Sequence, residues 1–310
     1  MKVIISKAPS KKAASTAQSS SQTQFEFEST SSTTILAIKK EVAKRFPKLT
    51  IERQRLTIPD KKIVLEDKKT LGDYSINNGD VIHFKDLGPQ IAWKTVFLIE
   101  YFGPIVIHSL FYHFPRVFFL QSFKHSNVQR ALYWMAVAHY LKRELETILV
   151  HRFSHATMPF SNIYKNCFHY YFFGGALLAF FNYGPKFKLG SPTDLATSNS
   201  TILLSIVLFT FFELSNLSTH ITLKNLRPPG STVRRIPYGY GFTMVSCPNY
   251  LFEILSWASY ALIAEKYSSL IFLTVSAVQM YLWAVKKHKA YLKEFPNYPK
   301  SRKAIFPYLA

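Results

Sequence analysis

The sequence is poor in cysteine and in acidic residues. Only two cysteines, Cys167 and Cys247, occur in 310 residues, and both lie in or beside apolar segments. This argues against the disulfide framework that small secreted domains use. Asp and Glu number 18 against 38 Lys and Arg, which gives a formal net charge of +20. Such an excess of positive charge favours anionic partners: nucleic acid, phospholipid headgroups or phosphorylated small molecules.

The sequence also lacks the apolar leader of a secreted protein. The N-terminus, "MKVIISKAPSKKAAS", contains a run of only three apolar residues before it turns polar. Because a signal peptide needs a longer apolar region, we expect the N-terminal part of the chain to stay on the cytosolic side of a membrane.

Residues 1–87 have the pattern of a small soluble domain. Strand character is present at Lys2–Ser6 and around Phe25–Glu28, and we interpret the Ser/Lys/Ala/Gln-rich stretch between them as a long hairpin loop. Thr33–Phe46 places apolar residues at helical spacing, and three strand-like runs follow, "QRLTI", "KKIVL" and "DVIHF". This order, with "KTLGDYSI" before the last strand, resembles ubiquitin and its relatives. We predict a β-grasp (ubiquitin-like) domain, and without a following diglycine we expect no conjugation to other proteins.

Residues 88–310 have a different character. Hydrophobic residues make up 48% of the chain and aromatic residues 16%, more than a soluble domain of this size normally uses. Six segments approach the ~20 apolar residues that cross a bilayer. They are residues 92–114, 131–150, 168–184, 201–217, 250–264 and 267–285. We predict a multi-pass α-helical membrane protein with about six transmembrane helices, within a range of five to seven. The basic clusters Lys286–Lys289 and Lys300–Lys303 predict a cytosolic C-terminus.

Ionisable residues within these apolar segments are the first candidates for function, because charge at membrane depth is costly and usually faces a cavity or another charge. Glu100 lies inside the first segment, in "FLIEYFGP". The second segment is interrupted by "HYLKRELE", which contains Tyr140, Lys142 and Arg143. The alternatives are an interfacial Glu100 paired with a lysine, and a solvated amphipathic helix in the second segment.

Amides and cations recur at helical spacing at the end of the fourth segment. Residues at i, i+4, i+8 and i+11 predict one continuous stripe along a helix; they are Asn216, His220, Lys224 and Arg227. The following loop adds two more arginines. Donors leading into a basic loop suit the phosphates of a dinucleotide, although a solvated helix face would show the same pattern.

Two weaker motifs are set aside. Gly239 and Gly241 lack the G-x-x-G continuation and the βαβ unit of a Rossmann site, so we expect any nucleotide to bind between membrane helices. His151 and His155, in "HRFSH", match one box of membrane di-iron enzymes, but such sites need several further histidine boxes. We therefore expect no metal.

The stretch "SCPNYLFEILSW" places polar residues at the start of an apolar helix. Pro248 suits the first position of a helix. Asn249 and Glu253 are four residues apart, and Tyr250 is three before Glu253, so we expect all three to line one cavity. An interfacial cap, with Tyr250 in an aromatic belt, is the alternative.

Several blocks together resemble a known family. "LRPPGSTVRRIPYGYGFTMVSCPNYLFEILSW" and "YLKEFPNYPKSRKAIFPYL" are similar to the C-terminal domain of steroid 5α-reductases. The ubiquitin-like domain, the junction "KDLGPQIAWKTVFLIEYFGP", the block "HYLKRELETILVHRFSHATMP" and "NCFHYY" narrow the resemblance to the fungal type of very-long-chain trans-2-enoyl-CoA reductase. The resemblance covers essentially the whole chain and is weakest in the insertion after the first strand.

The resemblance implies a reaction. These enzymes use NADPH to reduce the C2–C3 double bond of a trans-2-enoyl-CoA, the last step of each fatty-acid elongation cycle, in the endoplasmic reticulum membrane. It implies a catalytic Tyr250 in "PNY" and a catalytic Glu100 in "EY", with Tyr250 giving a proton or polarising the thioester carbonyl. Tyr140 matches the tyrosine that contacts the carbonyl in steroid reductases, so two tyrosines remain candidates for the proton donor.

The resemblance also implies binding residues and partners. It places Gln90, Lys142 and Arg143 near the substrate and the CoA or NADPH phosphates. The implied NADPH-facing positions are Asn216, Arg227, Arg235, Asn249, Glu253, Lys287 and Tyr291. The sequence departs from the steroid reductases at two positions, where His220 replaces an acid and Lys287 replaces a histidine.

The expected partners are the long-chain enoyl-CoA, membrane lipid and the other elongation enzymes, which are the elongase, the ketoacyl-CoA reductase and the dehydratase. Nucleic acid is not expected, and both termini should be cytosolic. Two other functions remain open: a steroid or polyprenol reductase of the same family, and a membrane scaffold that recruits partners through its ubiquitin-like domain.

Overall fold

The computed structural model describes residues 1–8, 24–59, 63–153, 156–228 and 233–308. The chain divides into two compact units, Met1–Ala92 with His155–Asn162, and Trp93–Ser154 with Ile163–Ala310. Each unit has its own hydrophobic core.

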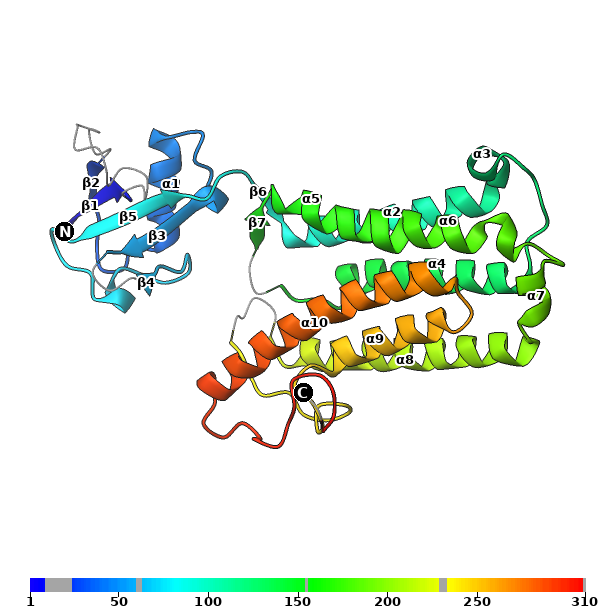
Figure 1. Ribbon diagram of the computed structural model, residues 1–310. Helices are drawn as coiled ribbons and strands as arrows, with labels where there is room; N and C mark the ends of the chain where they lie inside the picture. Colours follow the sequence, from blue (N-terminus) through cyan, green and yellow to red (C-terminus); the bar gives the residue numbers. More distant parts are fainter. Residues whose placement is uncertain (9–23, 60–62, 154–155, 229–232, 309–310) are drawn as a thin grey trace, which may run out of the picture. The chain divides into compact units, whose positions relative to one another are not determined.

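The first unit is a mixed sheet with one helix, visible in blue and cyan in Figure 1. The sheet has the order β2-β1-β5-β3-β4, in which β1 and β5 are parallel and the other pairs are antiparallel. Its strands are β1 (Lys2–Lys7), β2 (Gln24–Glu28), β3 (Gln54–Ile58), β4 (Ile63–Val64) and β5 (Val81–Asp86), and its helix is α1 (Ile35–Arg45). The predicted order of elements is confirmed, whereas the predicted hairpin loop lies largely outside the described residues.

The core of this unit follows from the sequence pattern. In β1 the buried side chains of Val3 and Ile5 alternate with outward ones, and α1 buries Ile35, Ile38 and Val42 on one face. Thr34 caps α1 by accepting a hydrogen bond from the Ala37 N–H. The sheet therefore buries one apolar face against α1, as a β-grasp domain requires. A second ladder in this unit pairs β6 (Gln90–Ala92) with β7 (Thr157–Pro159).

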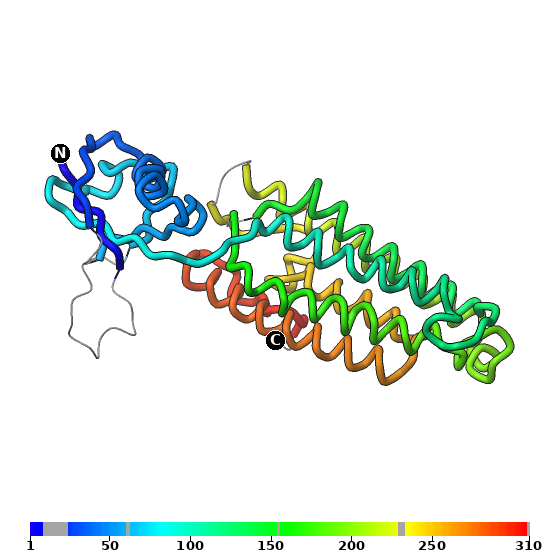
Figure 2. Tube along the Cα trace, turned by 90° about the horizontal axis from the view of Figure 1, so that it is seen from above, coloured from blue at the N-terminus to red at the C-terminus, as the bar shows by residue number. Residues whose placement is uncertain are grey.

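The second unit is a helical bundle, and Figure 2 shows its helices running side by side. Its longer helices are α2 (Trp93–His113), α4 (Asn127–Leu149), α8 (Asn199–Asn225), α9 (Pro248–Ala261) and α10 (Lys266–Glu294). The shorter ones are α3 (Pro115–Phe119), α5 (Asn162–Cys167), the π-helical η4 (Phe168–Leu177), α6 (Leu178–Tyr183) and α7 (Pro192–Ala196). Helix α4 packs on α2 and α8, and α9 packs between α8 and α10.

Three helices within the described residues are long and apolar enough to cross a membrane: α2, α8 and α10. They coincide with the first, fourth and sixth predicted segments. The other three predicted segments are helical but do not meet the same test, so six transmembrane helices are not confirmed. Helix α4 carries "KRE" in its second half, α9 has only 14 residues, and the third segment is divided between η4 and α6.

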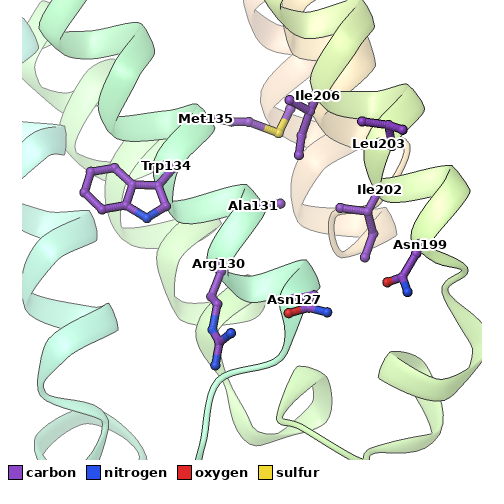
Figure 3. A pocket seen from close by; sticks show the side chains of 9 residues that line it. All are labelled: Asn127, Arg130, Ala131, Trp134, Met135, Asn199, Ile202, Leu203 and Ile206. Carbon is purple, nitrogen blue, oxygen red and sulfur yellow. The ribbon is translucent and has the colours of Figure 1, made fainter.

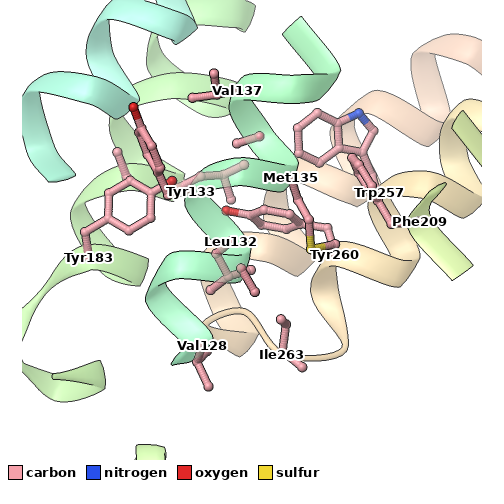
Figure 4. Packing of buried hydrophobic residues seen from close by; sticks show 14 of the residues in the cluster. Val128, Leu132, Tyr133, Met135, Val137, Tyr183, Phe209, Trp257, Tyr260 and Ile263 are labelled. Atoms are coloured by element: carbon pink, nitrogen blue, oxygen red, sulfur yellow. The ribbon is translucent and has the colours of Figure 1, made fainter. Parts of the chain in front are cut away.

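Aromatic side chains fill the core of the bundle (Figure 4). Trp257 and Tyr260 of α9 lie edge to face, with ring centroids 5.4 Å apart. The buried Asn182 of α6 donates to the hydroxyl of Tyr260 (3.1 Å) and accepts from the Glu265 N–H (2.7 Å). Since a buried amide needs partners, these bonds fix α6 against the α9–α10 corner. Two members of this core, Tyr140 and Trp257, also contact His139 of the polar site.

Candidate active site in the helical unit

Five polar side chains from α4, α8 and α9 form a closed cycle, called here the polar ring: Lys142, Glu213, His139, Glu253 and Asn216. Lys142 Nζ lies 2.7 Å from Glu213 Oε2, and Glu213 Oε1 lies 2.8 Å from His139 Nδ1. On the other side, His139 Nε2 lies 3.3 Å from Glu253 Oε1. Asn216 closes the cycle, since its Nδ2 donates to Glu253 Oε2 (3.2 Å) and its Oδ1 accepts from Lys142 (2.7 Å). Three helices that are distant in sequence thus meet at one charged site.

A second cluster adjoins the polar ring on α4. The Arg143 guanidinium pairs with Glu146, and its other nitrogen donates to the Tyr101 hydroxyl of α2 at 2.8 Å. Glu146 also lies 3.1 Å from His220 Nδ1 and 3.6 Å from Lys142 Nζ. Because Lys142 belongs to both groups, the two clusters form one continuous polar patch within the bundle.

Glu100 and Tyr140 are almost completely buried beside this patch, at 1% exposure each. Asn166 hydrogen bonds to the Glu100 carboxylate, whereas Glu100 Oε1 has no hydrogen-bond partner among the described residues. The Tyr140 hydroxyl donates to the Gly174 carbonyl at 3.4 Å, and its ring lies edge-on to His139, with centroids 5.0 Å apart. Glu100 is therefore a buried acid with spare hydrogen-bonding capacity.

The start of α9 connects the polar ring to a third group. Helix α9 begins at Pro248, as predicted, and the Asn249 carbonyl accepts a hydrogen bond from Asn216 at 2.8 Å. The next residue, Tyr250, contacts α10 instead, where the Lys287 ammonium lies 4.7 Å from the centroid of its ring. The Asn249 carbonyl and the Glu253 carboxylate thus contact Asn216 of α8, whereas the Tyr250 ring contacts α10, because α9 packs between these two helices.

Three predicted residues lie away from the polar ring or outside the helical unit. The prediction of a continuous helical stripe from Asn216 to Arg227 was wrong at its end, because α8 stops at Asn225. Arg227 directly precedes Pro228, and a residue before a proline is biased away from helix. Arg235 is exposed in an irregular segment. Gln90 belongs to the first unit, where its Oε1 accepts from Thr157 at 3.3 Å.

On α10, Lys287 and Tyr291 are one turn apart. Tyr291 stacks on Tyr298, with ring centroids 5.2 Å apart and planes nearly parallel. The C-terminal segment thereby covers this end of α10 and fixes the direction in which the Tyr291 ring points.

The sequence interpretation missed four residues of the patch: His139, Glu213, Glu146 and Tyr101. Glu213 is the only ionisable residue in the apolar run "TILLSIVLFTFFELSNL", and the rule that had singled out Glu100 applies to it equally. His139 directly precedes Tyr140 in the "HY" motif. The contacts of both depend on α4 facing α8, which the sequence does not specify.

Two further features lie near or beside the patch. Ligand atoms of Glu146, His151 and His220 lie within 4.8 Å of one another, a grouping that could hold a metal, but Arg143 and Lys142 already pair with this glutamate. His155, the other histidine of that motif, lies outside the described residues. A groove of about 420 Å³ lies between α4 and α8 and is shown in Figure 3; none of the predicted site residues lines it.

Comparison with known families agrees with this architecture. Residues 156–310 match the family described as 3-oxo-5-alpha-steroid 4-dehydrogenase, and residues 16–84 match the ubiquitin family. The chain thus combines a ubiquitin-family domain with an oxidoreductase domain of the steroid-dehydrogenase type.

Individual relatives are more specific. A putative enoyl reductase of Schizosaccharomyces pombe is 47% identical over 84% of this chain and 86% of its own. A probable very-long-chain enoyl-CoA reductase of Caenorhabditis elegans is 42% identical over 90% and 92%, and the very-long-chain enoyl-CoA reductase of Dictyostelium discoideum is 40% identical over 91% and 94%. The chain therefore belongs to the very-long-chain enoyl-CoA reductase family.

Proposed function

We propose that the protein reduces the C2–C3 double bond of trans-2-enoyl-CoA with NADPH, as the last step of very-long-chain fatty-acid elongation in the endoplasmic reticulum. The observation that carries this proposal is the charged patch inside the helical unit. A bundle of mostly apolar helices does not hold cations, carboxylates and an amide in contact without a use for them. The names of the relatives supply the class of substrate.

The residues of the patch suit a nicotinamide dinucleotide. Lys142 and Arg143 provide charge for phosphates, Asn216 provides an amide, and Glu253 provides an acceptor for hydroxyl groups. His151 Nδ1 is buried and has no hydrogen-bond partner within the described part of the chain, so a ligand hydroxyl could satisfy it. We assign cofactor binding to Asn216, Arg227, Arg235, Asn249, Glu253, Lys287 and Tyr291. When bound, NADPH supplies the hydride that adds to C3 of the substrate.

The protein's own task is to manage charge and one proton. Reduction at C3 moves negative charge onto the thioester oxygen, and a proton must then reach C2. We assign Tyr250 as the group that polarises the carbonyl or gives the proton, because the Lys287 ammonium over its ring stabilises negative charge on the phenol oxygen. Glu100 orients or reprotonates the donor, and the cations Lys142 and Arg143 lie near the CoA or NADPH phosphates. Tyr140 is the other candidate donor.

Location and partners follow from the same proposal. The basic clusters at Lys286–Lys289 and Lys300–Lys303 favour a cytosolic C-terminus, and the ubiquitin-family domain belongs on the same side. The substrate must come from a dehydratase in the same membrane, so we propose that this enzyme works beside the elongase, the ketoacyl-CoA reductase and the dehydratase.

The deciding experiment uses the purified full-length protein in detergent micelles. A long-chain trans-2-enoyl-CoA and a 4-en-3-one steroid are each offered with NADPH and with NADH. We expect turnover of the enoyl-CoA with NADPH as the preferred donor. Reduction of the steroid alone would favour the second candidate, a steroid or polyprenol reductase. The match of residues 156–310 to the steroid-dehydrogenase family supports this candidate. No turnover of either would leave a membrane scaffold.

A single added methyl group tests the position of Tyr140. In Gly174→Ala, the new Cβ would overlap the Tyr140 hydroxyl and also approach Phe272. Since this displaces the ring that touches His139, we expect kcat with enoyl-CoA to fall roughly 10- to 100-fold. Gly103→Ala is the matched control, because its Cβ would overlap the ring of Tyr171 rather than a site residue. An equal fall in kcat in both variants would mean that general disruption of packing, rather than Tyr140, explains the loss.

A further inference from the structure

Two members of the polar ring, His139 and Glu213, have no role so far in binding or catalysis. The side chains of His139 and Glu213 are 2% and 9% exposed, whereas those of Lys142 and Glu253 are 17% and 18% exposed. Lys142 and Glu253 are already proposed to bind substrate or cofactor, and so is Asn216, which is 1% exposed. His139 contacts Glu213 and Glu253, and Glu213 contacts Lys142.

The contacts of His139 fix the geometry of both accessible residues. Its Nδ1 faces a carboxylate oxygen of Glu213, and its Nε2 faces one of Glu253. Glu213 in turn lies between His139 and Lys142. The imidazole therefore bridges the two carboxylates of the polar ring, one of which also holds the Lys142 ammonium.

Packing restricts the imidazole as well. The ring of Trp257 lies 4.7 Å from that of His139 at a steep angle, and Tyr140 lies edge-on at 5.0 Å. Neither contact leaves the imidazole free to turn within the core. A small change at His139 therefore moves Glu253 directly and Lys142 through Glu213.

We propose that His139 and Glu213 are positioning residues that hold Glu253, Asn216 and Lys142 in the arrangement that binds the nicotinamide dinucleotide. This inference rests on the proposed function and adds two residues to it. It assigns them to cofactor affinity, because their polar contacts lead to the cofactor-facing residues, whereas His139 meets the candidate donor Tyr140 only through an edge-on ring contact.

The test compares full-length wild type, H139Q, E213Q and the double variant. Three quantities are measured: the NADPH dissociation constant from nicotinamide fluorescence, the kinetic constants with enoyl-CoA, and the melting temperature. We expect each single variant to raise both the dissociation constant and the KM for NADPH roughly tenfold. The kcat at saturating NADPH should change less than about threefold. Since the pair acts as one unit, the double variant should exceed the weaker single variant by no more than about twofold. If H139Q does not accumulate, E213Q tests the inference alone, because glutamine keeps the size of the glutamate side chain.

His108 provides the matched control. It is also fully buried with both nitrogens hydrogen bonded, but to the Tyr183 hydroxyl (2.6 Å) and the Gly174 carbonyl (2.8 Å), both outside the polar ring. We expect H108Q to lower the melting temperature without changing the NADPH dissociation constant. An NADPH affinity in E213Q within twofold of wild type, or an equal loss in H108Q, would overturn the inference and leave the proposed function intact. A wild type that neither binds NADPH nor reduces enoyl-CoA would refute the proposed function itself.

Discussion

Replacing Tyr250 by phenylalanine should abolish most enoyl-CoA reduction while the protein still accumulates, inserts and binds NADPH. Removing a positioned proton donor typically costs about 10²- to 10⁴-fold in rate, and we expect kcat to fall within this range. The NADPH dissociation constant should stay near that of wild type, since the ring of phenylalanine keeps the contact with Lys287. Single-turnover oxidation of NADPH in the presence of saturating enoyl-CoA measures the effect on the chemical step.

Tyr140→Phe is the informative comparison. The Tyr140 hydroxyl donates to the Gly174 carbonyl and is buried among His139, Trp257 and His108. Tyr250 is half-buried and lies under an ammonium group. On these contacts we expect Tyr140→Phe to lose less activity than Tyr250→Phe. The reverse order would move the proton donor to Tyr140, and full activity in Tyr250→Phe would remove that residue from catalysis.

The sequence predicts some parts of this molecule well because their physics is local. The alternation in β1, the apolar face of α1 and the start of α9 at Pro248 each depend on neighbouring residues, and each is confirmed. The predicted first apolar segment, residues 92–114, differs from α2 by one residue at each end. Hydrophobicity and capping signals suffice for such elements.

The number of membrane spans is less local. Helix α4 carries Lys142, Arg143 and Glu144, and these charged residues lower its mean hydropathy. The third segment contains a π-helical stretch with Gly174 and Gly175 at its close contacts, and this divides one hydrophobic run between two elements. Charge in one segment and irregular helix in the other thus weaken the hydropathy pattern.

The site itself is predicted only as a set of residues. Sequence similarity pointed to Lys142, Asn216 and Glu253, and the structure brings these three into one polar ring. Sequence similarity did not point to His139 and Glu213, which contact Glu253 and Lys142 in the same ring. Residues that act through others have no motif of their own, because their contacts are defined by the packing of α4, α8 and α9.

Replacing Glu100 by glutamine should reduce kcat by about 10²- to 10³-fold, the scale expected when a preorganised charged group is removed from a catalytic centre. Glu100 is 1% exposed in an apolar helix, and one of its oxygens has no hydrogen-bond partner among the described residues. The hydroxyl of the adjacent Tyr101 accepts a hydrogen bond from Arg143. A buried carboxylate in this position can take up and return a proton, whereas an amide of the same size cannot.

Glu144→Gln is the control for this prediction. Glu144 lies on α4 and lines a second groove with four residues of α2, and it also has an oxygen without a hydrogen-bond partner among the described residues. It takes no part in the polar ring or in the contacts of Arg143, so its neutralisation should leave kcat within about twofold of wild type. If both variants lose activity alike, burial of a negative charge in the bundle is what matters; if only Glu100→Gln does, the carboxylate acts on the reaction. Full activity in Glu100→Gln would require another group to reprotonate the donor, and the buried acid Glu146 would be the next to test.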